Sequence, residues 1–358
     1  MPPARPTLRT GIEEVDPRHA LDVPRLEACL RAELEEFEGT LDVRQFVGGQ
    51  SNPTYLLSDG TRSWVLRRKP PGKLVSSAHA TDREFRVLSA LAGTDVPVPR
   101  VRFYCDDEAV IGTEFYVMDR VEGRILVDQT LPDWTPTERR ALYESQLDVL
   151  AALHRVDFQA VGLDDYGKPG NYFARQVHVW SKQYTASQAE PDERCASMER
   201  LMEWLPENIP ADETTTIVHG DFGLNNLMLH QTEPRIAAAL DWELSTLGHP
   251  FADVTYHLSA RLFPTSPFQD FDEDGLRAAG LPTQDEYVAG YCARTGRDGI
   301  PDLDWYLAFH LFRTAGIMFG IAGRAKAGTA NSDQARSLGA SAMPLADRAL
   351  ELARALGA

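Results

Sequence analysis

The spacing of the hydrophobic residues changes from helical to strand-like near residue 40 of the chain. Apolar residues between positions 26 and 37 recur at helical spacing, behind the helix-capping residue Asp22 and before Gly39. Three short apolar runs then follow, at residues 41–47, 54–58 and 63–69. The dipeptide Asp59-Gly60 joins the last two runs and is typical of a tight hairpin turn. The sequence therefore predicts one helix followed by an antiparallel meander.

The next segment contains one more helix and two more strands before the chain becomes mainly helical. Helical spacing returns from Phe85 to Leu91, and residues 100–105 and 114–118 have the pattern of strands. Thr135 followed by Pro136 indicates the start of a helix, and helical spacing dominates from there. Three short apolar runs interrupt the later helices, at residues 217–219, 227–229 and 236–240. We expect these runs to form a small β insertion.

This order of elements predicts an α+β fold with two lobes. The order β-β-β-α-β-β indicates a small antiparallel N-terminal lobe at residues 40–120. Residues 121–358 are mainly helical and are expected to form a larger C-terminal lobe. Residues 1–39 are expected to form a helical extension before both lobes.

Composition and charge narrow the classes of partner. The chain has 358 residues, 43% of them hydrophobic, which is enough to bury a substantial core. The formal net charge of −17 disfavours nucleic acid and anionic membrane as main partners, because long-range repulsion opposes both. The apolar stretch 305–322 contains His310 and Arg313, so we expect a buried helix there and no membrane span. The four cysteines are scattered without a close pair, which favours free thiols and a cytoplasmic protein.

The segment VHGDFGLNNLML contains the most specific chemical motif. His219, Asp221 and Asn226 lie between two apolar runs, and the spacing from Asp to Asn equals that of the protein-kinase catalytic loop. Asp241 directly follows the apolar run IAAAL, at an expected strand end. Phosphoryl transfer needs a carboxylate at the acceptor hydroxyl and oxygen ligands for Mg²⁺. We therefore predict Asp221 as the catalytic base and Asn226 and Asp241 as metal ligands. His219 is expected to orient the loop, with a merely packed histidine as the alternative.

The N-terminal lobe offers residues that suit a nucleotide. In FVGGQSNPTYLL, Gly48 and Gly49 allow backbone N–H groups to approach phosphates closely, although a plain hairpin turn is the alternative. Arg67 on the third strand and Glu84 on the following helix match the cation and glutamate with which a kinase positions phosphates.

The end of the fifth strand is the expected adenine contact. Met118 ends that strand, and Asp119 to Val121 form an extended connection whose backbone would hydrogen-bond an adenine. An ordinary linker between lobes is the alternative, and both interpretations can hold. Together with the catalytic motif, these features predict a bilobal protein-kinase-like fold that binds ATP and Mg²⁺.

These residues together resemble the aminoglycoside phosphotransferase and choline kinase-like superfamily, from about Gln45 to the C-terminal helices. The stretches LRRKPPGKLVSSAHATDREFRVL, GLDDYGKPGNYFARQ, RLMEWLPENIP and LDWELSTLGHPFADVTYHL are similar to the kinase-like domain of acyl-CoA dehydrogenase family members ten and eleven and its stand-alone bacterial relatives. No dehydrogenase follows, so the resemblance implies a free-standing form. It also implies a role for each of five residues. Asp221 would be the base, and Asn226 and Asp241 the magnesium ligands. Glu84 would be the partner of the phosphate-binding cation, and Asp253 an anchor of the metal loop.

Two features depart from the pattern of these relatives. Arg67 stands where many of them carry Lys, and a planar guanidinium contacts phosphate differently from an ammonium group. Lys69 points to the same side of the strand as Arg67 and is the alternative cation. Gly223 and Asn225 stand where close relatives tend to carry a basic residue and an acid, which leaves the acceptor contact open.

The predicted function is an ATP- and magnesium-dependent kinase that phosphorylates a hydroxyl group of a small-molecule acceptor. The closer resemblance implies a hydroxyacyl-CoA or a hydroxy acid as acceptor, and an aminoglycoside or choline-type kinase is one alternative. A non-catalytic nucleotide-binding pseudokinase module is another, against which the intact Asp221, Asn226 and Asp241 argue. DWE in place of DFG, and the lack of a recognisable APE segment, argue against a protein kinase.

Overall fold

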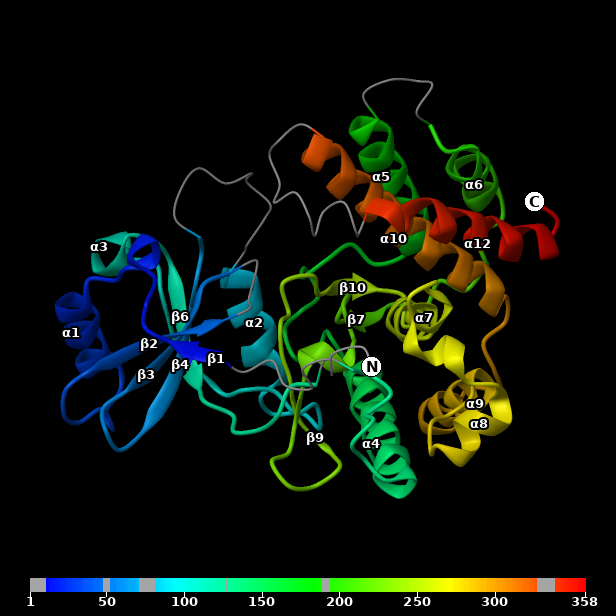
Figure 1. The fold of residues 1–358 in the computed structure, drawn as a ribbon. Helices are drawn as coiled ribbons and strands as arrows, with labels where there is room; N and C mark the ends of the chain where they lie inside the picture. The colour runs from blue at the N-terminus through cyan, green and yellow to red at the C-terminus, as the bar shows by residue number, and fades with distance from the viewer. Residues whose placement is uncertain (1–10, 48–51, 71–80, 127, 189–193, 327–338) are drawn as a thin grey trace. The chain divides into compact units, whose positions relative to one another are not determined.

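The computed structural model describes residues 11–47, 52–70, 81–126, 128–188, 194–326 and 339–358. The chain forms two compact units (Figure 1). The first unit contains Met1–Tyr166 and Gly223–Ser245, and the second contains Gly167–Phe222 and Thr246–Ala358. The boundaries predicted from the pattern along the chain, after residues 39 and 120, stay predictions. Gly48 and Gly49, the predicted phosphate-binding turn, lie outside the described residues.

The first unit is built on a six-stranded antiparallel sheet. Its strand order is β1-β2-β3-β4-β6-β5. The strands are β1 (Gly11–Glu13), β2 (Asp42–Val47), β3 (Thr54–Ser58), β4 (Ser63–Arg68), β5 (Val101–Cys105) and β6 (Phe115–Asp119). The predicted meander of β2, β3 and β4 is confirmed, with Asp59 and Gly60 at the turn between the last two strands and Gly60 at φ +91°.

Alternation along β4 gives the sheet two different faces. Trp64 and Leu66 are buried in an apolar cluster with Leu26 and Leu30 of helix α1 (Val23–Glu33). Arg67 lies on the opposite face, where it forms an ion pair with Glu84 of helix α2 (Thr81–Leu91). Since successive side chains of a strand point to opposite faces, α1 covers the apolar face and α2 the polar one. Figure 1 shows the two helices on opposite sides of the sheet.

The N-terminal segment differs in two ways from the prediction. Helix α1 is capped by Asp22, as predicted, but ends at Glu33, before the expected stop at Gly39. Leu34 has an extended backbone, and the following residues pack Phe37 into the sheet cluster. Strand β1 was not predicted, because it has three residues, all exposed, and no apolar alternation.

The rest of the first unit is helix α4 (Pro136–Arg155), the short helix α3 (Glu108–Ile111) and a hairpin of β8 (Leu227–Leu229) and β9 (Ile236–Ala239). Thr135 caps α4 in a capping box with Glu138, with Pro136 at the first position, as the sequence predicts. Ser145 of α4 accepts a hydrogen bond at 3.0 Å from the N–H of Ile236. The hairpin is thereby fixed against α4.

The second unit is mainly helical, with one two-stranded sheet of β7 (Thr216–Val218) and β10 (Thr246–Gly248). Strand β10 was not predicted. In the described part of the second unit, the α-helices are α5 (Tyr172–Ser187), α6 (Ala196–Glu207), α7 (Phe251–Ser259), α8 (Glu273–Ala278), α9 (Gln284–Thr295), α10 (Leu303–Lys326) and α12 (Ala342–Ala355). Short 3-10 helices are η1 (Pro17–His19) in the first unit, η3 (Leu224–Asn226) before β8, and η4 (Ala260–Leu262) and η5 (Pro267–Asp270) after α7.

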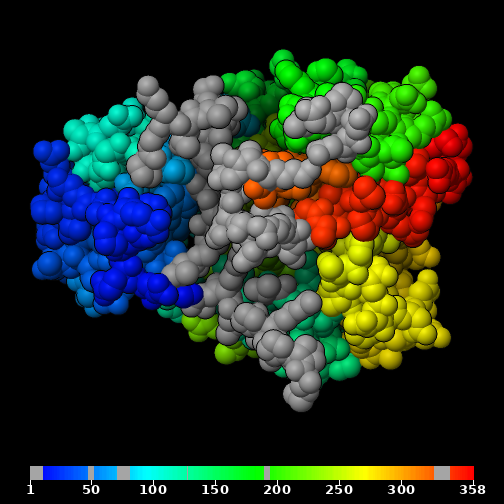
Figure 2. Space-filling model, turned by 45° about the horizontal axis from the view of Figure 1, so that its top comes forward, coloured from blue at the N-terminus to red at the C-terminus, as the bar shows by residue number. Residues whose placement is uncertain are grey.

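Helix α10 forms the core of the second unit. Trp305, Phe309 and Phe312 are almost fully buried, and α10 packs against α5, α7 and α12. Figures 1 and 2 both show α12 alongside α10. The helix predicted from the apolar stretch 305–322 is therefore present. Across the described ranges, no helix combines the length and apolar character needed to cross a membrane. All four cysteines are free thiols, as predicted.

Candidate active site

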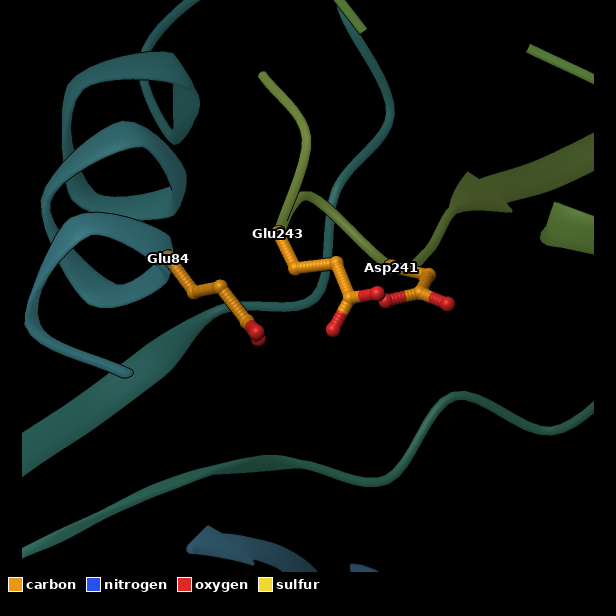
Figure 3. Close-up of side chains that lie close together, drawn as sticks. All are labelled: Glu84, Asp241 and Glu243. Atoms are coloured by element: carbon orange, nitrogen blue, oxygen red, sulfur yellow. The ribbon is translucent and has the colours of Figure 1, made fainter. Parts of the chain in front are cut away.

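Three carboxylates of the first unit converge on the polar side of the sheet. Glu84 comes from α2, and Asp241 and Glu243 come from the segment that follows β9 (Figure 3). Each offers an oxygen atom, and these atoms lie within 4.8 Å of one another. Carboxylate oxygens are the preferred ligands of Mg²⁺, so this group fits a divalent cation. Glu243 was not predicted as a site residue, although it stands only two positions after Asp241.

Arg67 binds all three carboxylates. Its Nε lies 3.1 Å from an oxygen of Glu84, and its Nη2 lies 2.6 Å from Asp241 and 3.8 Å from Glu243. The predicted pairing of Arg67 with Glu84 is therefore present. The Arg67 side chain is 12% exposed, so the cation is held largely away from water. One arginine thus neutralises part of the charge of three acids that would otherwise repel one another.

Glu84 is buried and tied to three other groups. Its side chain is 1% exposed and accepts hydrogen bonds from Asn52 Nδ2 at 2.9 Å and the Tyr116 hydroxyl at 2.7 Å. Burial raises the pKa of Glu84 to about 6, although Arg67 and Tyr116 favour the ionised form. Burial alone would lower the pKa of Arg67, but Glu84, Tyr116 and Asp241 together outweigh it, and the net pKa of Arg67 is raised. The arginine stays charged at any working pH.

Lys69, the alternative cation, lies elsewhere. Its ammonium group lies 2.5 Å from an oxygen of Glu114, which also accepts a hydrogen bond from the Tyr104 hydroxyl at 2.6 Å. These hydrogen bonds lower the pKa of Glu114. The geometry therefore favours Arg67 over Lys69 as the partner of Glu84.

The two predicted metal ligands, Asn226 and Asp241, lie on neighbouring backbone segments of the first unit. Asn226 directly precedes β8, and its carbonyl oxygen accepts a hydrogen bond at 2.8 Å from the N–H of Leu240. Asp241 follows Leu240 and has a left-handed backbone, with φ +65°. That conformation is uncommon outside glycine, although Asp and Asn tolerate it better than other residues. Such local backbone strain is often found at functional sites.

The predicted adenine-binding segment lies at the end of β6. Tyr116 and Met118 alternate with Val117, and Tyr116 points towards Glu84, so Met118 shares the polar face of the sheet. Asp119 points to the opposite face, where Arg102 donates to it at 2.6 Å. Its N–H donates to the carbonyl oxygen of Arg100 at 2.8 Å. Val121 follows β6 without regular secondary structure, so its backbone is the better remaining candidate for an adenine contact.

The part of the predicted catalytic motif that lies in the second unit is held by a buried aspartate. Asp253 of α7 is fully buried, and its two carboxylate oxygens accept the N–H groups of His219 at 2.7 Å and Gly220 at 2.8 Å. Gly220 has φ +82°, which an L side chain rarely adopts. The resemblance implied Asp253 as an anchor of the metal loop; the two bonds seen here hold the backbone directly before the predicted base Asp221.

His219 also acts on the loop. It is fully buried, and its Nδ1 accepts the N–H of Asp221 at 3.3 Å. The ring packs edge-on against Phe222. A buried ring that accepts a backbone N–H suits the orienting role predicted for this residue.

Three further residues, which the sequence did not predict, form a connected group that reaches Asp221 through Tyr256. The Tyr256 hydroxyl of α7 donates a hydrogen bond to Asp221, and burial together with the charge of Asp221 raises the pKa of Tyr256 far above its ordinary value. Arg313 of α10 lies over the rings of Tyr256 and Trp180. They come from three different helices, and no local spacing in the sequence links them to the catalytic motif.

The family of the chain follows from comparison with known proteins. Residues 42–291 match the model of the phosphotransferase enzyme family. The chain belongs to this family. A candidate aminoglycoside phosphotransferase from Ralstonia eutropha has a crystal structure that is 47% identical in sequence, with a TM-score of 0.86 over 94% of this chain and 99% of that one.

More distant solved structures share the fold. A thermostable mutant of an aminoglycoside phosphotransferase, solved as a ternary complex with ADP and hygromycin B, is 18% identical, with a TM-score of 0.58 over 92% of this chain and 98% of that one. The predicted α+β, protein-kinase-like fold and the predicted superfamily are therefore confirmed.

Two curated relatives are longer than this chain. Acyl-CoA dehydrogenase family member 10 of Mus musculus is 42% identical over 97% of this chain and 33% of its own length. Acyl-CoA dehydrogenase family member 11 of Homo sapiens is 39% identical over 97% of this chain and 45% of its own length. The chain spans less than half the length of these relatives. The closer resemblance given in the sequence analysis is thereby confirmed.

Proposed function

We propose that this phosphotransferase transfers the γ-phosphoryl group of ATP to a hydroxyl group of a small molecule, in a magnesium-dependent reaction. The observation that supports this most strongly is the convergence of Arg67, Glu84 and Asp241 in a chain of this family. A cation paired with a helix glutamate, beside an aspartate that follows a strand, is the arrangement with which kinases position phosphates and metal. The complex of a related fold with ADP and hygromycin B supports the same pairing of nucleotide and small acceptor.

Arg67 is proposed to position the nucleotide phosphates. Its guanidinium is planar and carries five N–H donors, so it can keep Glu84 while donating to phosphate oxygens. Asn52 and Tyr116 hold the Glu84 carboxylate from the other side. This support keeps the arginine in one place before the nucleotide arrives, so less ordering is needed on binding.

Asp241 and Asn226 are proposed to bind Mg²⁺, with Glu243 as a third oxygen donor nearby. The cluster of carboxylate oxygens fits a hard cation. When bound, Mg²⁺ would neutralise the charge that develops on the transferred phosphoryl group. Since Arg67 already binds Asp241 at 2.6 Å, the aspartate must exchange this partner or share it when it takes a metal ligand role.

Asp221 is proposed to accept the proton of the acceptor hydroxyl. The hydroxyl oxygen forms a bond to the γ-phosphorus, the bond to the β–γ bridging oxygen breaks, and ADP leaves. The hydroxyl proton passes to the Asp221 carboxylate. Asp253 and the His219 ring accept the N–H groups of His219, Gly220 and Asp221, so the backbone that leads into this carboxylate is held before the acceptor binds.

The proposed acceptor is a hydroxyacyl-CoA or a hydroxy acid. Two relatives that match nearly the whole chain are named as acyl-CoA dehydrogenase family members. A hydroxylated acyl compound is therefore a natural acceptor to test first. The name of the solved structure from Ralstonia eutropha makes aminoglycosides the second class to test.

The test is direct measurement of phosphoryl transfer by the purified chain. ATP and Mg²⁺ are supplied with hydroxy acids, hydroxyacyl-CoAs, choline and aminoglycosides, and phosphorylated products are identified by mass spectrometry. We expect ATP-dependent addition of one phosphoryl group to a hydroxylated acyl compound, and none when EDTA removes the metal. Transfer that survives EDTA would reject the magnesium dependence, and no product with any acceptor class would reject the proposal.

A further inference from the structure

Two thiols of the first unit lie next to each other, although they are far apart in the sequence. Cys29 belongs to α1 and Cys105 ends β5, and their thiols are joined by a hydrogen bond. Both side chains pack against the apolar cluster between α1 and the sheet, and both are partly exposed. The other two cysteines, Cys195 and Cys292, are buried and belong to the second unit. The first pair is therefore the one that a small reagent can reach.

The backbone brings both cysteines to the face of the sheet that α1 covers. Phe103 of β5 belongs to the buried cluster on this face, and Cys105 stands two positions later, so the two side chains point the same way. Arg25, one turn before Cys29 on α1, donates a hydrogen bond at 2.8 Å to the carbonyl oxygen of Ala109 in α3. Helix α3 packs next to α1, as Figure 1 shows. The contact between the thiols thus depends on regular elements that are packed together.

Metal binding is one use of paired thiols, and the neighbours of this pair do not support it. A structural zinc site takes four ligands, usually Cys and His. Within the described ranges, the potential metal ligands that gather in threes within 4.8 Å of one another are Glu84, Asp241 and Glu243. The two thiols therefore lack further ligands in the part of the chain that the structure describes. Oxidation of the pair is the reaction that fits two thiols alone.

The two cysteines differ in how readily they lose a proton. Burial, together with the neighbouring Cys105, raises the pKa of Cys29 to about 12. Cys29 therefore keeps its proton near neutral pH. Since the thiolate is the form that reacts with an oxidant, the first step is assigned to Cys105. Once Cys105 has reacted, its charge no longer helps to raise the pKa of Cys29, so Cys29 can take the second step.

We propose that Cys29 and Cys105 form a disulfide when hydrogen peroxide oxidises the folded chain. The Cys105 thiolate attacks the peroxide, an S–O bond forms, and the O–O bond breaks to leave a sulfenic acid and hydroxide. The Cys29 sulfur then attacks the sulfenic sulfur, the S–S bond forms, and the S–O bond breaks as water leaves with the Cys29 proton. In sum, two thiols lose two electrons and two protons, and one peroxide becomes two molecules of water. The proposal goes beyond the phosphotransferase function and does not depend on it.

The disulfide would fasten α1 to the edge of the sheet, because β5 is the last strand in the sheet order. The bond would close a loop over residues 29–105, which contains β2, β3, β4 and α2. Closing a long loop restricts the unfolded chain and thereby favours the folded one. Oxidation is therefore expected to stabilise the first unit.

The test oxidises the whole folded chain with hydrogen peroxide, blocks the remaining thiols with iodoacetamide and maps the digested peptides by mass spectrometry without reduction. We expect a peptide that joins Cys29 to Cys105 and separates again with dithiothreitol. The midpoint of thermal unfolding should rise by about 5–10 °C on oxidation and return on reduction. Cys29→Ser and Cys105→Ser should lose the linked peptide and the rise. Cys292→Ser is the matched control and should keep both.

The single variants also test the order of the two steps. In Cys29→Ser, the sulfenic acid at Cys105 has no thiol to react with, so dimedone should trap it. In Cys105→Ser, dimedone should label Cys29 only weakly, because burial still raises its pKa. Stronger labelling of Cys29 than of Cys105 would contradict the proposed order.

Three results would overturn the disulfide itself. One is an oxidised wild type without the linked peptide, and another is linkage of either residue to Cys195, to Cys292 or to a second copy of the chain. The third is a linked chain whose thermal midpoint does not rise, which would mean that the bond does not bridge the folded first unit. None of these results would bear on the proposed phosphotransferase function.

Discussion

Arg67 is the residue on which the nucleotide side of the site depends. It binds Glu84, Asp241 and Glu243 at once. Lysine has one compact charge and could not span these groups with the same geometry. Lys69, the nearest other cation considered for this role, is paired with Glu114 instead of Glu84. We therefore expect the substitution of these two cations to have different consequences.

Arg67→Met should weaken binding of Mg·ATP by about 1.5–3 kcal/mol, because charged hydrogen bonds to phosphate are lost. Arg67→Lys should retain part of the affinity. Lys69→Met is the matched control, because it removes a cation from the same strand face and leaves Glu84 its partner. Titration calorimetry measures all three. A severe loss in Lys69→Met together with a mild one in Arg67→Met would assign the role to the lysine.

Glu84 makes the stability of the fold depend on pH. Its pKa is about 6 in the folded chain, against an ordinary value of 4.5. Between these values the folded state binds more protons than the unfolded state, so the contribution of Glu84 to stability falls as pH rises from 4.5 to 6. The shift corresponds to roughly 2 kcal/mol. Glu84→Gln cannot titrate and isolates this effect.

We expect the difference in free energy of unfolding between wild type and Glu84→Gln to fall by about 2 kcal/mol from pH 4.5 to pH 7, and then to stay constant. Urea unfolding at a series of pH values provides the measurement. A difference that rises over this range would mean that the pKa of Glu84 is lowered in the folded chain, as in an ordinary exposed ion pair.

At the scale of single elements, the catalytic loop depends on helix α7. Asp253, in the first turn of α7, accepts two backbone N–H groups of the loop while fully buried. Neither hydrogen bond could be replaced by water without opening the core. The backbone of the loop that carries His219 and Asp221 is thus held directly by this helix.

Asp253→Ala should lower the free energy of unfolding by about 2–4 kcal/mol, because two charged hydrogen bonds are lost and two N–H groups are left unpaired. Its kcat should fall more than its affinity for Mg·ATP, since the substitution displaces the loop of the second unit. Asp253→Asn keeps one acceptor oxygen and should lie between the wild type and Asp253→Ala. Wild-type kcat and stability in Asp253→Ala would show that the loop has another anchor.

The sequence predicted the elements better than their contacts. Strands β3 and β8 begin and end where the apolar runs do, and Asp22 and Thr135 cap helices as expected, because alternation and capping are local signals. Strands β1 and β10 have three residues each and depend on their partner strands. The neighbours of Asp221 depend on helix packing across long stretches of chain. Glu243 is a missed site residue with a local signal, since it stands only two positions after the predicted ligand Asp241.

At the scale of the whole molecule, the residues proposed for one reaction come from both compact units. The chain passes from the second unit to the first between Phe222 and Gly223, inside the catalytic motif. Asp221 therefore belongs to the second unit, while Asn226 and Asp241 belong to the first.

The most direct test of this proposal is turnover by Asp221→Asn, measured as phosphorylated product at saturating ATP and Mg²⁺ alongside the affinity for Mg·ATP. The substitution keeps the size of the side chain and removes the proton acceptor. We expect turnover to fall by roughly 10²–10⁴-fold, the usual contribution of a positioned acid or base, while Mg·ATP affinity stays near that of the wild type. Near-normal turnover in this variant would contradict the assignment of Asp221 as the base, and with it the proposed mechanism.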